Sequence, residues 1–133
     1  MDINTLIDTV NKFIVNGGYN PKDVIVTHGG ALVLLGYIDT TTDIDVWVSR
    51  DIWVDEIVKG GTPVSLGGGV WCMAVTPDID IHIGFGELYY PPVVNTGGWH
   101  SMDTQDLLIS YEALNRPKDK QKIKMLQVAS LSA

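Results

Sequence analysis

Two short segments of the chain combine residue types that metal-assisted phosphate chemistry uses. Gly29-Gly30 is a glycine pair, and twelve residues separate it from the segment Asp43-Ile44-Asp45. Glycine lets a phosphate approach the backbone closely, and amides at the start of a helix attract anions. Carboxylates are the hard oxygen ligands that Mg²⁺ prefers. The two segments together predict a site for phosphoryl or nucleotidyl transfer, whereas either one alone is also typical of an ordinary turn or a solvated strand.

The two aspartates of the second segment are expected to share one face of a strand. Asp43 and Asp45 are two residues apart, and apolar side chains alternate with them. In a strand, residues at this spacing point to the same side. Two neighbouring carboxylates repel each other unless a cation lies between them. We therefore expect Asp43 and Asp45 to bind Mg²⁺; the alternative is an edge strand with an acidic, solvated outer face.

A second acidic strand is predicted where Asp78, Asp80 and His82 alternate with isoleucines. Asp80 has an isoleucine on each side, which favours a position inside the strand, whereas Asp78 follows a proline. We take Asp80 as the third carboxylate of the site and keep Asp78 as the alternative. His82 is either a hydrogen-bond donor to a metal ligand or a solvated or hydrogen-bonded strand histidine.

The elements that must position these residues follow from the periodicity of apolar side chains. The pattern predicts helices over residues 3–16, 31–35, 51–59, 103–114 and 117–131. It predicts strands over residues 23–27, 43–49, 63–66, 70–76 and 79–83, with Gly67–Gly69 closing a hairpin. Residues 85–102 are expected to form a long loop of the kind that often carries function. Strands alternating with helices predict an α/β or α+β fold, with a mixed sheet flanked by helices in one domain over residues 1–133.

Composition limits the classes of function. Hydrophobic residues make up 45% of the chain and charged residues 19%, which favours a folded protein over a disordered one. The formal net charge is −7. A negative surface repels phosphate polymers, so we expect no long nucleic acid among the partners.

Cysteine content and hydropathy predict the compartment. Cys72 cannot form an internal disulfide, and its apolar surroundings predict a buried, inert thiol in a reducing environment. The first residues lack a basic and then apolar leader, and no apolar run reaches the roughly 18 residues of a membrane span. We therefore expect a cytoplasmic protein, in the host cytoplasm if the gene is viral, with no membrane partner.

The combined motifs resemble the nucleotidyltransferase superfamily related to DNA polymerase β. That superfamily has a Gly-Gly or Gly-Ser turn, a short spacer, an Asp-x-Asp or Asp-x-Glu strand and a third acidic strand. Gly29-Gly30, Asp43-Ile44-Asp45 and Ile79-Asp80-Ile81 are similar to these parts. Arg116-Pro117-Lys118-Asp119 is similar to an Arg-x-Lys-Asp segment that opens a helix in small bacterial and phage-type members. The resemblance spans roughly residues 23–126.

The resemblance implies a Mg²⁺-dependent transfer of a nucleoside monophosphate from a nucleoside triphosphate to a hydroxyl of a protein, an RNA end or a small molecule. It assigns catalysis and the metal to three carboxylates, those of Asp43, Asp45 and Asp80, with Asp80 either a ligand or the general base. It assigns nucleotide binding to Gly29, Gly30, Thr41, Thr42 and Lys118. A solvated lysine at the start of a helix is the alternative for Lys118.

One position departs from this family pattern. Many relatives have a threonine two positions before the first aspartate, and Thr41 fits this. They also have a basic residue four positions before that aspartate, where this chain has the acidic Asp39. The chain is also short, so a homodimer or another protein is expected to complete the site. The alternative function is a catalytically inactive module of the same fold that binds a protein partner in a toxin–antitoxin or phage–host conflict. The aromatic residues of the long loop, which would form its binding surface or else join the core, are Phe85, Tyr89, Tyr90 and Trp99.

Overall fold

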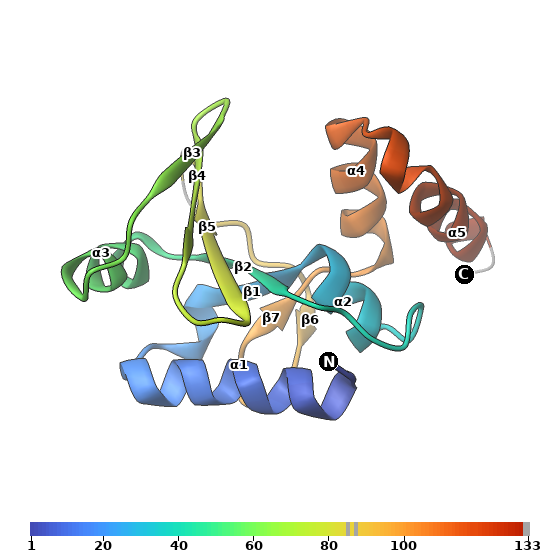
Figure 1. Ribbon diagram of the computed structural model, residues 1–133. Helices are drawn as coiled ribbons and strands as arrows, with labels where there is room; N and C mark the ends of the chain where they lie inside the picture. Colours follow the sequence, from blue (N-terminus) through green and yellow to red (C-terminus); the bar gives the residue numbers. More distant parts are fainter. Residues whose placement is uncertain (85, 87, 132–133) are drawn as a thin grey trace.

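The computed structural model describes residues 1–84, 86 and 88–131 (Figure 1). Within these residues the strands form a seven-stranded mixed sheet in the order β3-β4-β5-β2-β1-β7-β6. β2 lies at the centre, parallel to β5 and antiparallel to β1. The strands are β1 Val24–Thr27, β2 Ile44–Val48, β3 Val64–Gly67, β4 Val70–Ala74, β5 Ile79–Ile83, β6 Val93–Val94 and β7 His100–Ser101. The predicted α/β class with a mixed sheet is confirmed.

The helices of the described residues have clear local signals at their ends. They are α1 Ile3–Gly17, α2 His28–Leu34, α3 Arg50–Val58, α4 Thr104–Leu114 and α5 Lys120–Leu131, with short 3₁₀ turns at Pro21–Asp23 (η1) and Pro117–Asp119 (η2). The Asp2 carboxylate accepts a hydrogen bond of 2.9 Å from the amide of Thr5 and so caps α1. Asp103 and Asp106 form a reciprocal capping box at the start of α4. Residue pattern and capping together place these helices close to the predicted ranges.

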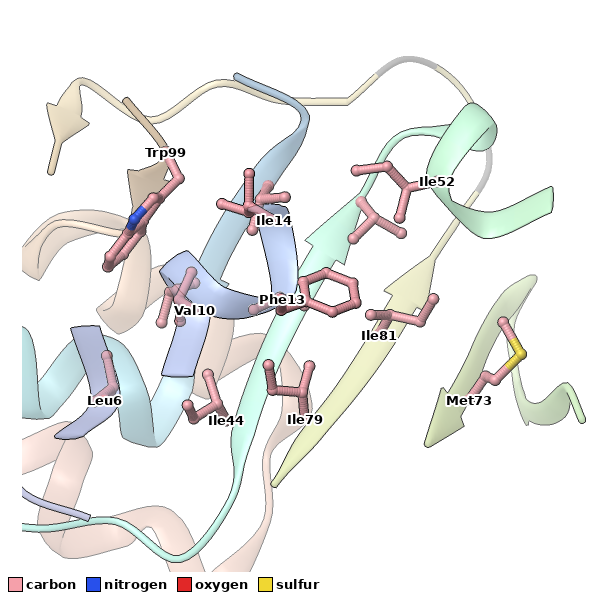
Figure 2. Close-up of a cluster of buried hydrophobic side chains, with 14 of the residues drawn as sticks. Leu6, Val10, Phe13, Ile14, Ile44, Ile52, Met73, Ile79, Ile81 and Trp99 are labelled. Carbon is pink, nitrogen blue, oxygen red and sulfur yellow. The ribbon is translucent and has the colours of Figure 1, made fainter. Parts of the chain in front are cut away.

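The main core fills one face of the sheet. In Figure 1, α1 runs below the sheet, whereas α4 and α5 stand above it. Figure 2 shows apolar side chains of α1 next to isoleucines of the central strands. In β2 the buried residues are Ile44, Val46 and Val48, so the alternation of the strand leaves Asp45 and Trp47 on the opposite face. The core face of this strand therefore determines which side its carboxylate takes.

A second, smaller core holds α2, α4 and α5 together on the other side of the sheet. Its buried members are Ala31, Leu32, Leu107, Leu108, Tyr111 and Leu126. Fully burying one leucine contributes about 1.5–3 kcal/mol to stability. This core places the α4–α5 pair beside the start of α2, next to the polar face of β2.

The long segment after β5 differs from the prediction of a simple loop. It contains β6 and β7, and β7 pairs in parallel with β1. The side chain of Trp99 is fully buried, and its indole N–H donates to Asn11 Oδ1 at 2.9 Å. Tyr89 and Tyr90 are exposed, and Phe85 lies outside the described residues. Trp99, the residue before β7, therefore belongs to the main core and reaches α1 through its hydrogen bond to Asn11.

The expectation for Cys72 also needs correction. The thiol is half-buried, not fully buried. The neighbouring Met73 takes the core position in β4, so Cys72 points to the opposite face. There, partial burial and then the negative charges of Asp80 and Asp45 raise the pKa of the thiol. Cys72 is therefore a weakly acidic thiol on the polar face of the sheet.

No helix in the described part of the chain is both long and apolar enough to cross a membrane.

Candidate functional site

A cleft of about 710 Å³ opens on the face of the sheet opposite α1. Its floor comes from β2 and β5, one wall from the β3–β4 hairpin, and the other from α4 and α5. Figure 1 shows the hairpin and the α4–α5 pair rising on either side of β2. Of the residues predicted from sequence, the cleft brings together Gly29, Thr41, Thr42, Asp43, Asp45 and Lys118. Its described lining does not include Gly30 or Asp80.

The two glycines make different contacts. α2 begins at His28, three residues before the predicted start, so both glycines lie in its first turn. A Cβ on Gly29 would lie 2.7 Å from Thr41 Oγ1, at the cleft. A Cβ on Gly30 would lie 2.8 Å from a methyl group of Val26, in the main core. Gly29 therefore allows the loop before β2 to approach α2, whereas Gly30 allows α2 to pack on β1.

The three predicted carboxylates lie on and beside two neighbouring parallel strands. Asp45 in β2 and Asp80 in β5 are directly opposite in register, and the exposed Asp43 precedes β2. Partial burial, followed by the negative charges of Asp45 and Asp43, raises the pKa of Asp80. The residues thus concentrate negative charge at the start of β2, as the sequence predicted for Asp43 and Asp45.

One of these carboxylates already has a partner. His82 Nε2 lies 3.2 Å from Asp45 Oδ1, and this hydrogen bond is the main reason why the pKa of Asp45 is lowered. The imidazole of His82 also stacks on the indole of Trp47, with ring centroids 5.9 Å apart. Both interpretations of His82 made from the sequence allow the hydrogen bond to Asp45, and the structure rules out only a fully solvated side chain, since His82 is 16% exposed.

The donor set fits Mg²⁺ through two carboxylates. In the described part of the chain no three His, Cys, Asp or Glu side chains form a group that could hold a metal ion, so Asp43, Asp45 and Asp80 do not make a complete ligand set. Mg²⁺ in proteins is usually bound through one or two carboxylates, with water and substrate phosphates in the remaining positions. Asp43 and Asp45, which both line the cleft, would supply these two ligands.

Positive charge gathers on the wall formed by the end of α4 and the start of α5. Arg116, Lys118 and Lys122 all line the cleft there. Arg116 Nε donates to Asp119 Oδ2 at 2.6 Å, and Lys122 Nζ lies 3.8 Å from Asp119 Oδ1. Asp119 is fully buried and orients Arg116 through this hydrogen bond, whereas its ion pair with Lys122 is longer and involves no hydrogen bond.

Sequence reasoning assigned a role to Lys118 but none to the other two cations. Lys118 and Lys122 are four residues apart, a spacing that places two side chains on one side of a helical segment. This four-residue spacing was the one feature of the sequence that could have placed Lys122 beside Lys118. Arg116 stood in the quoted motif, but only the tertiary structure shows that it reaches the same cleft.

An apolar surface completes the cleft on the hairpin side. Trp47, Leu66 and Val70 lie there. Sequence alternation already places Trp47 on the same face as Asp45, yet gives it no role. A flat aromatic group such as a nucleobase can stack on a tryptophan ring.

A histidine and a serine from distant parts of the chain also meet at the cleft. His28 Nε2 lies 2.9 Å from Ser110 Oγ, and the imidazole packs edge-on against Tyr111 at 5.0 Å. Burial lowers the pKa of His28. His28 precedes the glycine pair, but no sequence pattern connects it to Ser110, which is 82 residues away.

No known family model, curated protein or solved structure matches this chain. The choice of a reaction therefore depends on the chemistry of the cleft.

Proposed function

We propose that the protein is a Mg²⁺-dependent nucleotidyltransferase that moves a nucleoside monophosphate from a nucleoside triphosphate to a hydroxyl acceptor and releases pyrophosphate. One observation carries this proposal: carboxylates line the floor of one cleft, and cations line one of its walls. Asp43 and Asp45 lie at β2, and the cations on the α4–α5 wall are Arg116, Lys118 and Lys122.

The size and surface of the cleft support a nucleotide. Its volume of about 710 Å³ is in the usual range for small-molecule sites. The triphosphate would lie against the basic wall, and the base against Trp47. Since the whole chain has a net charge of −7, these local cations and a bound Mg²⁺ are needed to offset repulsion of the nucleotide.

The chain's own residues would mainly position the reactants. Asp43 and Asp45 would hold Mg²⁺, which when bound supplies charge neutralisation on the phosphate oxygens. Arg116, oriented by Asp119, would hold the phosphates on the other side. Asp80 lies in register with Asp45 but is not among the described residues that line the cleft, so we assign it no direct contact with the nucleotide. Phosphates held between the metal ion on the floor of the cleft and the cations of the α4–α5 wall would be oriented for in-line attack by the acceptor oxygen.

The decisive experiment is a label-transfer assay. The protein is incubated with Mg²⁺ and each α-labelled nucleoside triphosphate, with and without a cell lysate. We expect label transfer, and a loss of about 100-fold or more in Asp43→Asn and Asp45→Asn, the scale for removing one preorganised electrostatic group. Asp8→Asn is the matched control, because Asp8 is an exposed carboxylate on α1 paired with Lys12. Absence of both nucleotide binding and transfer contradicts the proposal.

The second candidate function is that of a catalytically inactive module of the same fold that binds a protein partner. Two observations favour it: Asp45 is engaged by His82, and the described residues offer no group of three metal ligands. The exposed Asp39 adds negative charge before β2. Nucleotide binding without any transfer in the same assay would select this candidate.

A further inference from the structure

A serine and a histidine form a hydrogen-bonded pair across the cleft. His28 is the first residue of α2, and Ser110 lies in the C-terminal half of α4. Ser110 Oγ and His28 Nε2 are 2.9 Å apart, and both residues line the cleft that holds the carboxylates and the cations. The pair therefore has access to whatever the cleft binds.

Thr27 contacts the other ring nitrogen of His28 and can orient the imidazole. Thr27 Oγ1 donates its proton to the backbone carbonyl of Asp45 at 3.3 Å and lies 3.1 Å from His28 Nδ1. When that hydroxyl donates to the Asp45 carbonyl, its oxygen is left to accept from Nδ1–H, and this arrangement satisfies both contacts. His28 Nε2 is then the acceptor nitrogen of the neutral ring, and Ser110 Oγ–H donates to it.

The backbone holds His28 in place for this contact. Its φ is +50°, a left-handed conformation that residues other than glycine rarely adopt. Such strain is concentrated at functional sites, where the surrounding structure supports it. Burial lowers the pKa of His28 and so favours the neutral ring that can take up a proton. Serine nucleophiles are activated by this kind of arrangement, in which the hydroxyl is hydrogen-bonded to a base and a third group orients that base.

We propose that Ser110 is itself a nucleotidyl acceptor, so that the chain modifies its own α4 helix. Ser110 Oγ attacks the α-phosphorus of the nucleoside triphosphate, and its proton passes to His28 Nε2. The new Oγ–P bond forms as the bond from the α-phosphorus to the bridging oxygen breaks, and pyrophosphate leaves with that electron pair. This inference rests on the proposed nucleotidyltransferase function, because it uses the same nucleotide and the same cations.

Mass spectrometry of the wild-type chain tests the inference directly. The full chain is incubated with Mg²⁺ and ATP, or with each other nucleoside triphosphate, and its intact mass and peptide map are recorded. We expect one nucleotidyl group per chain, located on Ser110. Because this mapping needs no variant, it remains informative if substitution of Ser110 impairs folding.

Variants then separate chemistry from a structural role. Ser110→Ala should abolish self-labelling, and His28→Asn should slow it by about 100-fold or more, the usual contribution of a general base. Asparagine is chosen because it tolerates the left-handed conformation. Ser130→Ala is the matched control: Ser130 lies on α5 and its hydroxyl donates to Gln105 at 3.0 Å, so self-labelling should not change.

Two contrary outcomes are distinguishable. Transfer to lysate proteins or small molecules, with wild-type Ser110 unmodified or with the label on another residue, overturns the inference and leaves the proposed function in place. No nucleotide binding and no transfer to any acceptor overturns both.

Discussion

At the scale of single residues, the cleft depends on side chains that orient one another. Asp119 has no exposed surface, yet it accepts a hydrogen bond from Arg116 and pairs with Lys122 at 3.8 Å. His82 orients the Asp45 carboxylate through a hydrogen bond of 3.2 Å. A buried charge without its partner is costly, so removal of one member affects both stability and binding.

We expect Asp119→Ala to lower the free energy of unfolding by about 2–3 kcal/mol, because Arg116 then loses its buried partner. The same change should weaken nucleoside triphosphate binding, since Arg116 and Lys122 lose their orientation. Urea unfolding and calorimetric titration would measure the two effects. Asp8→Ala removes an exposed pair with Lys12 and should change little. Equal effects of the two substitutions would contradict the role of Asp119.

The burial of His28 predicts a pH dependence of stability. Burial is the main cause that lowers the pKa of His28 below its ordinary value of 6.5. The positive charges of Arg116 and His82 lower it further, whereas the negative charges of Asp45 and Asp119 oppose the shift. The unfolded chain then binds more protons at this site, so its contribution to stability is complete above pH 6.5 and is lost as the pH falls toward the folded pKa.

We therefore expect the melting temperature of the wild-type protein to decrease from about pH 7.5 to about pH 5.5, and to decrease less in His28→Asn. Thermal unfolding followed by circular dichroism would show this difference. Identical pH slopes in the two proteins would mean that His28 is not the responsible group.

At the scale of elements, the α4–α5 pair is the part that positions the basic wall. The capping box at Asp103 fixes the start of α4, and the smaller core fixes α5 through the fully buried Leu126. Without that packing, Lys118 and Lys122 would not face β2. A substitution in the smaller core can therefore test the contribution of α5 without changing a residue that lines the cleft.

Leu126→Ala should cost about 2–4 kcal/mol of stability, because it leaves a cavity between α4 and α5. It should also reduce nucleotide affinity through the displaced lysines. Leu131, on the same helix, is 87% exposed, so Leu131→Ala is the control and should have almost no effect. Denaturant unfolding and nucleotide titration of both variants measure this. An unaltered affinity in folded Leu126→Ala would show that α5 is not needed to hold the phosphates.

At the scale of the whole molecule, the cleft exists because α4 and α5 cover only part of one face of the sheet. α1 and the main core fill one face, whereas on the other face the hairpin and the α4–α5 pair leave β2 and β5 open between them (Figure 1). Trp47 lies on that open face, and Trp71 lies on the other side of β4 from Val70.

We expect nucleoside triphosphates to quench the fluorescence of Trp47, because the base would stack on its indole ring. Quenching should disappear in Trp47→Phe and persist in Trp71→Phe, which is the matched control. Quenching that survives in Trp47→Phe would place the base elsewhere in the cleft.

Local sequence patterns predicted most of the sheet. The ranges for β1, β2, β5 and α1 were confirmed to within one or two residues, since each is a run of apolar side chains with one period. The predicted start of α2 was wrong because the glycine pair suggested a turn, whereas both glycines lie in the helix and Gly30 packs closely on Val26. β6 and β7 are two residues each, which is too short for a periodic signal.

The sequence by itself determined which side chains leave each face of β2 and β5, because alternation in a strand depends only on neighbouring residues. It thereby placed Asp43, Asp45 and Trp47 on one side. Only the tertiary structure decided what stands opposite them. Arg116, Lys122 and Ser110 reach the cleft because the smaller core packs α4 and α5 against α2. Such contacts join residues far apart in the chain, and no local period encodes them.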